Sequence, residues 1–329
     1  MKTALRILLW GLGVIGVVLV VGWAALQRPD IPYAALEAKY ANAASRYMDL
    51  PGGVRVHYRD QGIRDGPAVV MVHGFSASLH AWEPWVKDLG GRYRIITLDL
   101  PGHGLTRAPM GYAASADGYA DIVDQVATRL NAGPYVVVGN SMGGGVAWDL
   151  ALRHPDHVRG LILVDAAGWP VHAQRRGPPP LIFALLGNPV GRALIHHIDT
   201  HGMAAGGLRA AYVDTALVTP ALVDRYVELS RAPGHRDILM TIQSRPARPV
   251  TPATFAAIRV PTLVMHGQVD ALIPLADGRG FAGAIPGARL IIYPGVGHLP
   301  MEQIPDRSAA DVAAFLGALP AVGTGDKAR

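Results

Sequence analysis

The stretch YVVVGNSMGGGVAWDLALR, residues 135–153, decides the fold. Its first four residues form a short apolar run, which suits a strand covered on both faces. Residues 142–153 favour a helix. Between them Gly139, Ser141 and Gly143 match G-x-S-x-G, a pattern that exposes a serine hydroxyl on a sharp strand-to-helix turn. We predict that Ser141 is a nucleophile, the alternative being a structural glycine-rich turn.

Further apolar runs and helical stretches alternate on either side of this segment. This alternation predicts an α/β fold with a mostly parallel central sheet and helices on both faces. The other expected strands are residues 54–58, 68–72, 94–99, 161–165, 262–267 and 289–293, and the expected helices are about 117–131, 142–153, 276–284 and 306–318.

A serine hydroxyl is a weak nucleophile, so it needs a general base that a third group holds in place. In this type of fold the chain order is serine, then acid, then histidine. Asp270 and His298 each follow an expected strand, at the sheet edge that also carries Ser141. We predict His298 as the base and Asp270 as the acid. Asp165 also ends a strand and is the rival acid.

Two backbone N–H groups are expected to bind the oxyanion of a tetrahedral intermediate. One belongs to Met142, the residue after the serine. The second comes from the loop after strand 68–72, and we assign it to Phe75. In the same loop His73 is expected to hold the turn, and Gly74 to allow an unusual backbone angle.

The N-terminal segment Ile7–Leu26 contains 20 residues without a charge. A helix of this length spans about 30 Å, the thickness of a bilayer core. We predict a single-pass anchor with the rest of the chain on the non-cytoplasmic side, because Lys2 and Arg6 precede the span. The alternatives are a cleaved signal peptide, which would give a secreted protein, and a buried core helix. A G-x-G-x-x-G match inside this run lacks the strand that a dinucleotide motif requires.

Composition excludes several classes of protein. The chain has no cysteine, so disulfides, thiolate nucleophiles and cysteine metal sites are absent. Its net charge is +5 without a dense basic tract interleaved with aromatics, so we expect no nucleic-acid partner. The segment HHIDTH, residues 196–201, contains metal-ligand residue types in a spacing unlike H-E-x-x-H. We expect polar surface residues there, and neither a metal nor a cofactor.

These patterns divide the chain into segments. The run PPP (178–180) and the broken alternation between residues 169 and 250 predict a helical lid. Its apolar stretch 181–186 suits an acyl pocket, a surface that faces a membrane, or an ordinary amphipathic lid helix. The other boundaries are residues 1–27 for the anchor or signal, 28–44 for a linker, 45–168 and 251–319 for the core, and 320–329 for a flexible tail.

Five motifs, in order, resemble the α/β-hydrolase superfamily: HGF (73–75), DLPGHG (99–104), GNSMGG (139–144), DALIP (270–274) and GVGHLP (295–300). Within it, GNSMGG, LVDAAGW (163–169) and VGHLPM (296–301) resemble lipases and esterases of Moraxella/Psychrobacter type. The anchor ahead of them is similar to that of membrane-anchored monoacylglycerol lipases. Both resemblances imply hydrolysis of carboxylic esters that carry an acyl chain.

The sequence thus predicts a serine esterase or lipase that acts on a small-molecule ester, with lipid-derived or monoacylglycerol-like esters favoured and with membrane lipid contacted through the N-terminal helix. One alternative is a carbon–carbon bond hydrolase of aromatic ring-cleavage products, a group that also uses GNSxGG. Those enzymes usually have a Gly-Pro-rich oxyanion loop and a Trp after the histidine, where this chain has HGFSAS and Leu299. A non-catalytic ligand-binding protein of the same fold is the alternative from another class.

Overall fold

The computed structural model describes residues 2–170, 188–242 and 250–320. Its centre is an eight-stranded sheet with the strand order β1-β2-β4-β3-β5-β6-β7-β8. Only β2 runs antiparallel to its neighbours. The strands are β1 (Ser45–Asp49), β2 (Arg55–Gly62), β3 (Ala68–Val72), β4 (Arg94–Leu98), β5 (Tyr135–Asn140), β6 (Val158–Val164), β7 (Thr262–Gly267) and β8 (Arg289–Tyr293).

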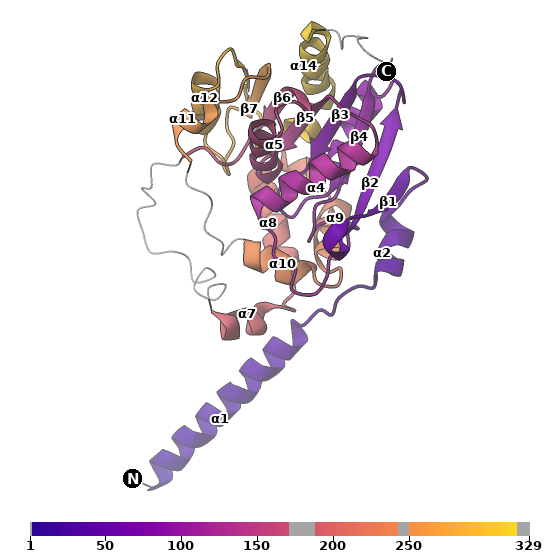
Figure 1. Cartoon of the computed structure of the whole chain (residues 1–329). Helices are drawn as coiled ribbons and strands as arrows, with labels where there is room; N and C mark the ends of the chain where they lie inside the picture. The colour runs from indigo at the N-terminus through magenta and orange to yellow at the C-terminus, as the bar shows by residue number, and fades with distance from the viewer. Residues whose placement is uncertain (1, 171–187, 243–249, 321–329) are drawn as a thin grey trace.

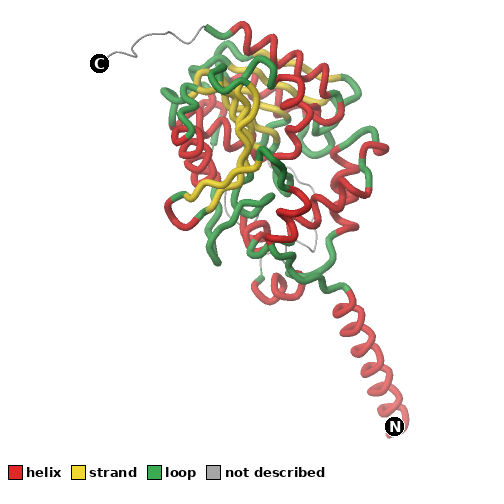
Figure 2. Tube along the Cα trace, turned by 90° about the vertical axis from the view of Figure 1, so that its right-hand side faces the viewer, coloured by secondary structure: helices red, strands yellow, loops and turns green. Residues whose placement is uncertain are grey.

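Helices cover both faces of this sheet (Figures 1 and 2). The predicted α/β fold with a mostly parallel central sheet and helices on both faces is therefore confirmed. The described helices are α1 (Lys2–Ala25), α2 (Tyr33–Tyr40), α3 (Glu83–Leu89), α4 (Ala116–Arg129), α5 (Met142–Arg153), α7 (Pro189–Ile195), α8 (His201–Ala211), α9 (Pro220–Ser230), α10 (His235–Ile242), α11 (Pro252–Phe255), α12 (Leu275–Ala284), α13 (Pro300–Gln303) and α14 (Pro305–Ala318).

Strand β3 shows why its apolar run forms a central strand. Successive side chains of a strand point to opposite faces. Val70 and Val72 therefore enter the core beneath α4, α5 and α12, whereas Val69 and Met71 enter the core beneath α3 and α14. Every residue of β3 is buried because both faces of the sheet are covered.

Several elements of the core were not predicted from the sequence, among them β1, α3 and the four-residue helices α11 and α13. Strand β1, with the sequence SRYMD, is an only partly buried edge strand, so its apolar pattern is weak. Helix α3 has seven residues and buries only Trp85 and Leu89 along its length, which gives little helical periodicity.

Helix α1 projects from the body and is solvent-exposed along its length (Figure 1). Residues Leu5–Ala25 are long and apolar enough to cross a membrane, with a mean hydropathy of 2.4 in the best window. The glycines of the G-x-G-x-x-G match lie inside this helix, with no strand before them, so the dinucleotide interpretation is excluded there.

The end of α1 and the residues after it are hydrogen-bonded to α7 and to the segment that follows α7. The indole nitrogen of Trp23 donates to the carbonyl of Leu194 at 2.8 Å. The backbone N–H of Arg28 donates to His197 at 2.6 Å, and Asp199 donates back to Leu26 at 2.8 Å. The end of α1 and the helices of residues 188–242 are thus joined directly, as Figure 1 also shows.

Helices α7 to α10 occupy the middle of the expected lid, residues 169–250. The apolar stretch 181–186 and most of the expected flexible tail, residues 321–329, lie outside the described residues.

Candidate active site

Ser141 occupies a strained turn between β5 and α5. Its φ of 53° lies in the left-handed region, which residues other than glycine seldom adopt. Backbone hydrogen bonds hold the turn. Its N–H donates to Val164 at 3.1 Å, and its carbonyl accepts from Gly144 and Ala167, both at 2.9 Å. Such a turn projects the hydroxyl from the end of the sheet.

The two glycines that flank the serine leave room for backbone. A Cβ on Gly139 would collide with the carbonyl of Gly143. A Cβ on Gly143 would collide with the carbonyls of Val72 and His73. The first turn of α5 therefore packs against the end of β3, which is the steric reason for glycine at both positions.

His298 and Asp270 lie together at the same edge of the sheet. Nδ1 of His298 is 2.7 Å from Oδ2 of Asp270, and both side chains are almost completely buried. Burial by itself raises the pKa of Asp270, but the hydrogen bond and charge of His298 outweigh that effect and the pKa lies below its usual value. The N–H groups of Leu272 and Ile273 also donate to this carboxylate.

The second nitrogen of His298 is the atom that a general base would use. Within the part of the chain that the structure describes, Nε2 forms no hydrogen bond, and neither does the hydroxyl of Ser141. Catalytic hydrogen bonds are often long without substrate and tighten when it binds.

Asn140 connects the serine turn to the histidine loop. Its amide nitrogen donates to the carbonyls of Val164 and His298, each at 3.1 Å. The sequence reasoning missed this role. The sequence signal for this role was an amide side chain at the first x of G-x-S-x-G, directly before the serine. Asn140 is buried there, at the end of β5.

Asp165, the rival acid, contacts Asp270 and not His298. Its Oδ1 accepts from the N–H of Gly267 at 2.8 Å, and its φ is 45°. Burial and the neighbouring Asp270 carboxylate raise the pKa of Asp165 well above its usual value. A protonated carboxyl beside an ionised one is the arrangement that two closely spaced acids favour.

The loop after β3 lies against the serine turn. A Cβ on Gly74 would be 3.2 Å from Cβ of Ser141. The N–H of Phe75 donates to no backbone acceptor in the described residues, and Met142 begins α5, so its N–H has no acceptor within the helix. Both predicted oxyanion donors are therefore available to a ligand.

Buried polar residues support this loop without facing the serine. His73 Nε2 accepts from the N–H of Leu100 at 3.1 Å, so its Nδ1 donates to the carbonyl of Gly74 at 2.7 Å. Asp99 accepts from the N–H groups of Leu79 and Leu105, at 2.8 and 2.9 Å.

The HHIDTH segment does not form one cluster. His196 pairs with Asp237 and His201 with Asp224, each at 2.8 Å. Asp199 pairs with Arg28 at 3.0 Å, close to the end of α1, and with His201 at 3.3 Å. These residues connect the helices of 188–242 to one another and to α1.

Sequence comparison identifies relatives of this chain. A family model described as the alpha/beta hydrolase fold matches residues 67–192. A 2-hydroxymuconate semialdehyde hydrolase of Pseudomonas sp. (strain CF600) is 28% identical, over 81% of this chain and 92% of its own length. A pimeloyl-[acyl-carrier protein] methyl ester esterase of Nitrosomonas europaea is 28% identical, over 77% and 96%. A monoacylglycerol lipase of Xenopus laevis is 28% identical, over 77% and 76%.

Solved structures share the fold over most of the chain. A thermophilic esterase from Thermogutta terrifontis has a TM-score of 0.69 at 25% identity and covers 84% of this chain and 98% of its own. A bacterial membrane phospholipase A has a TM-score of 0.69 at 24% identity, over 96% of this chain and 98% of its own. At this identity the second likeness concerns the fold alone.

Proposed function

The chain belongs to the α/β-hydrolase superfamily, and from that premise we propose that it is a serine hydrolase that cleaves carboxylic esters through an acyl-enzyme. One observation carries the proposal. Ser141 lies on a strained, glycine-flanked turn that Asn140 ties to the loop of a paired His298 and Asp270. The esterase and lipase among the relatives support the same reaction.

In the proposed mechanism Ser141 Oγ attacks the ester carbonyl while Nε2 of His298 takes its proton. Asp270 holds Nδ1–H of His298, which fixes the tautomer and stabilises the imidazolium. The N–H groups of Met142 and Phe75 stabilise the oxyanion. His298 then protonates the leaving alcohol, and water activated by the same nitrogen releases the acid from Ser141.

We further propose that the substrates are lipid-derived esters and that α1 remains as a membrane anchor. Trp23 and Arg28 at the end of α1 are hydrogen-bonded to residues 194 and 197. A membrane-spanning α1 would therefore bring α7 to the bilayer surface, where its exposed Val190 and Leu194 suit apolar surroundings. In this arrangement the catalytic domain lies on the non-cytoplasmic side. Secretion after signal cleavage is the alternative.

Initial rates on p-nitrophenyl esters from acetate to palmitate test the reaction. The full-length chain in detergent micelles is compared with Ser141→Ala, which we expect to lose on the order of 10⁴-fold or more in kcat. The preferred chain length separates an enzyme of small esters from a lipase. Equal rates in the two proteins would exclude Ser141 as the nucleophile.

Carbon–carbon bond hydrolysis is the second candidate, because a relative of the same identity is a 2-hydroxymuconate semialdehyde hydrolase. A ring-cleavage dienoate in the same assay discriminates between the two reactions. Turnover of the dienoate, with all esters inert and Ser141 required, would favour this candidate. Ligand affinity in Ser141→Ala, with no turnover of either substrate by the wild type, would favour a binding protein.

The fate of α1 needs a separate measurement. Carbonate extraction of membranes, followed by intact mass determination, reports whether residues 1–27 remain. Retention of the full mass in the membrane pellet supports an anchor. A shortened, extractable chain would instead indicate a cleaved signal.

A further inference from the structure

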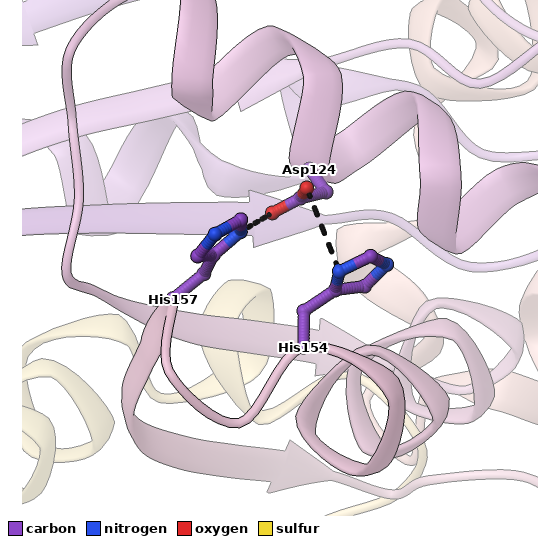
Figure 3. A group of neighbouring side chains, drawn as sticks. All are labelled: Asp124, His154 and His157. Carbon is purple, nitrogen blue, oxygen red and sulfur yellow. Dashed lines mark hydrogen bonds and ion pairs between the residues drawn. The ribbon is translucent and has the colours of Figure 1, made fainter.

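A second group of titratable side chains lies far from the candidate active site. Asp124 belongs to α4, His154 follows the last residue of α5, and His157 directly precedes β6. Figure 3 shows both imidazole rings beside the Asp124 carboxylate, each joined to it by a dashed line. The catalytic proposal gives this group no role.

The turn between the two histidines fixes their relative orientation. The N–H of His157 donates to the carbonyl of His154 at 3.0 Å, which closes a tight turn after α5. The rings are stacked, with 5.6 Å between their centroids and an angle of 16° between their planes. Both rings consequently present Nδ1 to the same carboxylate.

The distances in this group are close to those that a small cation requires. Nδ1 of His157 lies 2.8 Å from Oδ1 of Asp124, and Nδ1 of His154 lies 3.8 Å from Oδ2. In tetrahedral coordination with bonds of about 2.0–2.1 Å, neighbouring ligand atoms are separated by roughly 3.3 Å. The two observed distances lie below and above that value and run to different oxygens of the Asp124 carboxylate. One ligand atom from each of the three residues lies within 4.8 Å of the others, so side-chain rotations would bring them around a single ion.

Neighbouring groups orient the ligands as a metal site requires. The hydroxyl of Tyr135 donates to Oδ1 of Asp124 at 3.0 Å. Nε2 of His154 is buried without a hydrogen-bond partner and lies 3.7 Å from Oδ1 of Asp121. That carboxylate also pairs with Arg153 at 2.7 Å. A metal-bound histidine commonly directs its second nitrogen to a carboxylate, and His154 is positioned to do so.

We propose that Asp124, His154 and His157 form a binding site for Zn²⁺, with water completing the coordination. Two imidazole nitrogens and one carboxylate oxygen form a ligand set that zinc accepts, and the partial exposure of both histidines gives the ion access. The bound ion connects α4 to the turn between α5 and β6. It stabilises the folded chain, because the unfolded chain does not hold the three ligands together.

This site is separate from the proposed chemistry. His157 lies at the amino end of β6 and Ser141 beyond the carboxyl end of β5, so about 20 Å of strand lies between them. Among the described residues, a second group of ligand type, Asp165, His266 and Asp270, belongs to the candidate active site. Loss of zinc binding and loss of esterase activity are therefore independent outcomes.

Isothermal titration calorimetry of the tag-free, full-length protein with ZnCl₂ tests the proposal. We expect one saturable equivalent in the wild type and at least tenfold weaker binding in His157→Ala. Zinc should raise the Tm of the wild type but not that of His157→Ala.

His201→Ala is the matched control, since it removes an exposed histidine paired with Asp224 and should leave the titration unchanged. His154→Gln provides a second test if His157→Ala unfolds. Absence of a saturable heat in the wild type would overturn the proposal. A titration that both cluster variants leave unchanged, or that His201→Ala abolishes, would equally overturn it.

Discussion

Hydrogen bonds between buried atoms hold the turn at Ser141, whereas two backbone hydrogen bonds and partly exposed side chains hold the helices of residues 188–242 to the end of α1. The N–H of Ser141 and the amide of Asn140 both bind the carbonyl of Val164 inside the sheet. At the other region Arg28 and Asp199 form an ion pair whose side chains are 40% and 21% exposed. The first region has little freedom to move, and the second is able to rearrange at small cost.

The largest expected effect concerns Asp270 and Asp165, the two carboxylates at the sheet edge that carries Ser141. Asp270→Asn removes the acceptor of His298 Nδ1–H and should lower kcat/KM by about 10³–10⁴-fold. Asp165→Asn is its matched control, because Asp165 does not contact His298 and its raised pKa favours the neutral form that asparagine imitates. It should change the rate less than tenfold. Ester kinetics of the two variants decide the assignment. A larger loss in Asp165→Asn would reverse it.

Two glycines of α5 test how tightly the serine turn is packed. Gly143→Ala places a methyl group on the carbonyls of Val72 and His73, so we expect a loss of about 3 kcal/mol in unfolding free energy. Gly145→Ala, two residues further, meets its nearest atom, the carbonyl oxygen of Ala167, at an ordinary 3.6 Å. It should change stability by no more than about 1 kcal/mol. Urea denaturation measures both, and similar losses would contradict the packing described here.

The pH dependence of stability reports on Asp165. Its pKa is raised in the folded state, so above the unfolded pKa of about 3.9 only the folded chain keeps the proton. The contribution of this residue is fully present below that pH and is lost as the pH rises toward the folded pKa. Asp165→Asn should remove this decline. Denaturation of the wild type and Asp165→Asn between pH 4 and pH 8 gives the unfolding free energy of each as a function of pH. Parallel curves for the two proteins would exclude a raised pKa for Asp165.

The smallest expected effect concerns the exposed region. Asp199→Asn removes the ion pair with Arg28 and should alter the unfolding free energy by less than about 1 kcal/mol. Hydrogen exchange of peptides covering residues 188–199 should nevertheless become faster, because the joint to α1 is weakened. Asp49→Asn, on the distant strand β1, is the control. Unchanged exchange in Asp199→Asn would contradict this prediction, because it would mean that the backbone hydrogen bonds alone hold residues 188–199 to the end of α1.

Local sequence patterns were sufficient to predict the sheet edge that carries Ser141, Asp270 and His298, but not the long-range contacts around it. The G-x-S-x-G turn and the positions of Asp270 and His298 on loops after strands can each be predicted from a short segment. The same holds for the order of serine, acid and histidine along the chain. The contact of Asn140 with His298 joins residues 158 positions apart, and that of Trp23 with Leu194 spans 171. No local periodicity encodes such contacts. Strand β1 was missed because half-buried residues at a sheet edge alternate only weakly.

Covalent labelling with a fluorophosphonate, followed by peptide mass spectrometry, tests the central claim most directly. The reagent reacts with a serine that a neighbouring base activates. The account predicts a single mass shift on the peptide that contains Ser141, abolished in Ser141→Ala and greatly slowed in His298→Ala. An unlabelled wild-type protein, or a label of undiminished rate in His298→Ala, would contradict it.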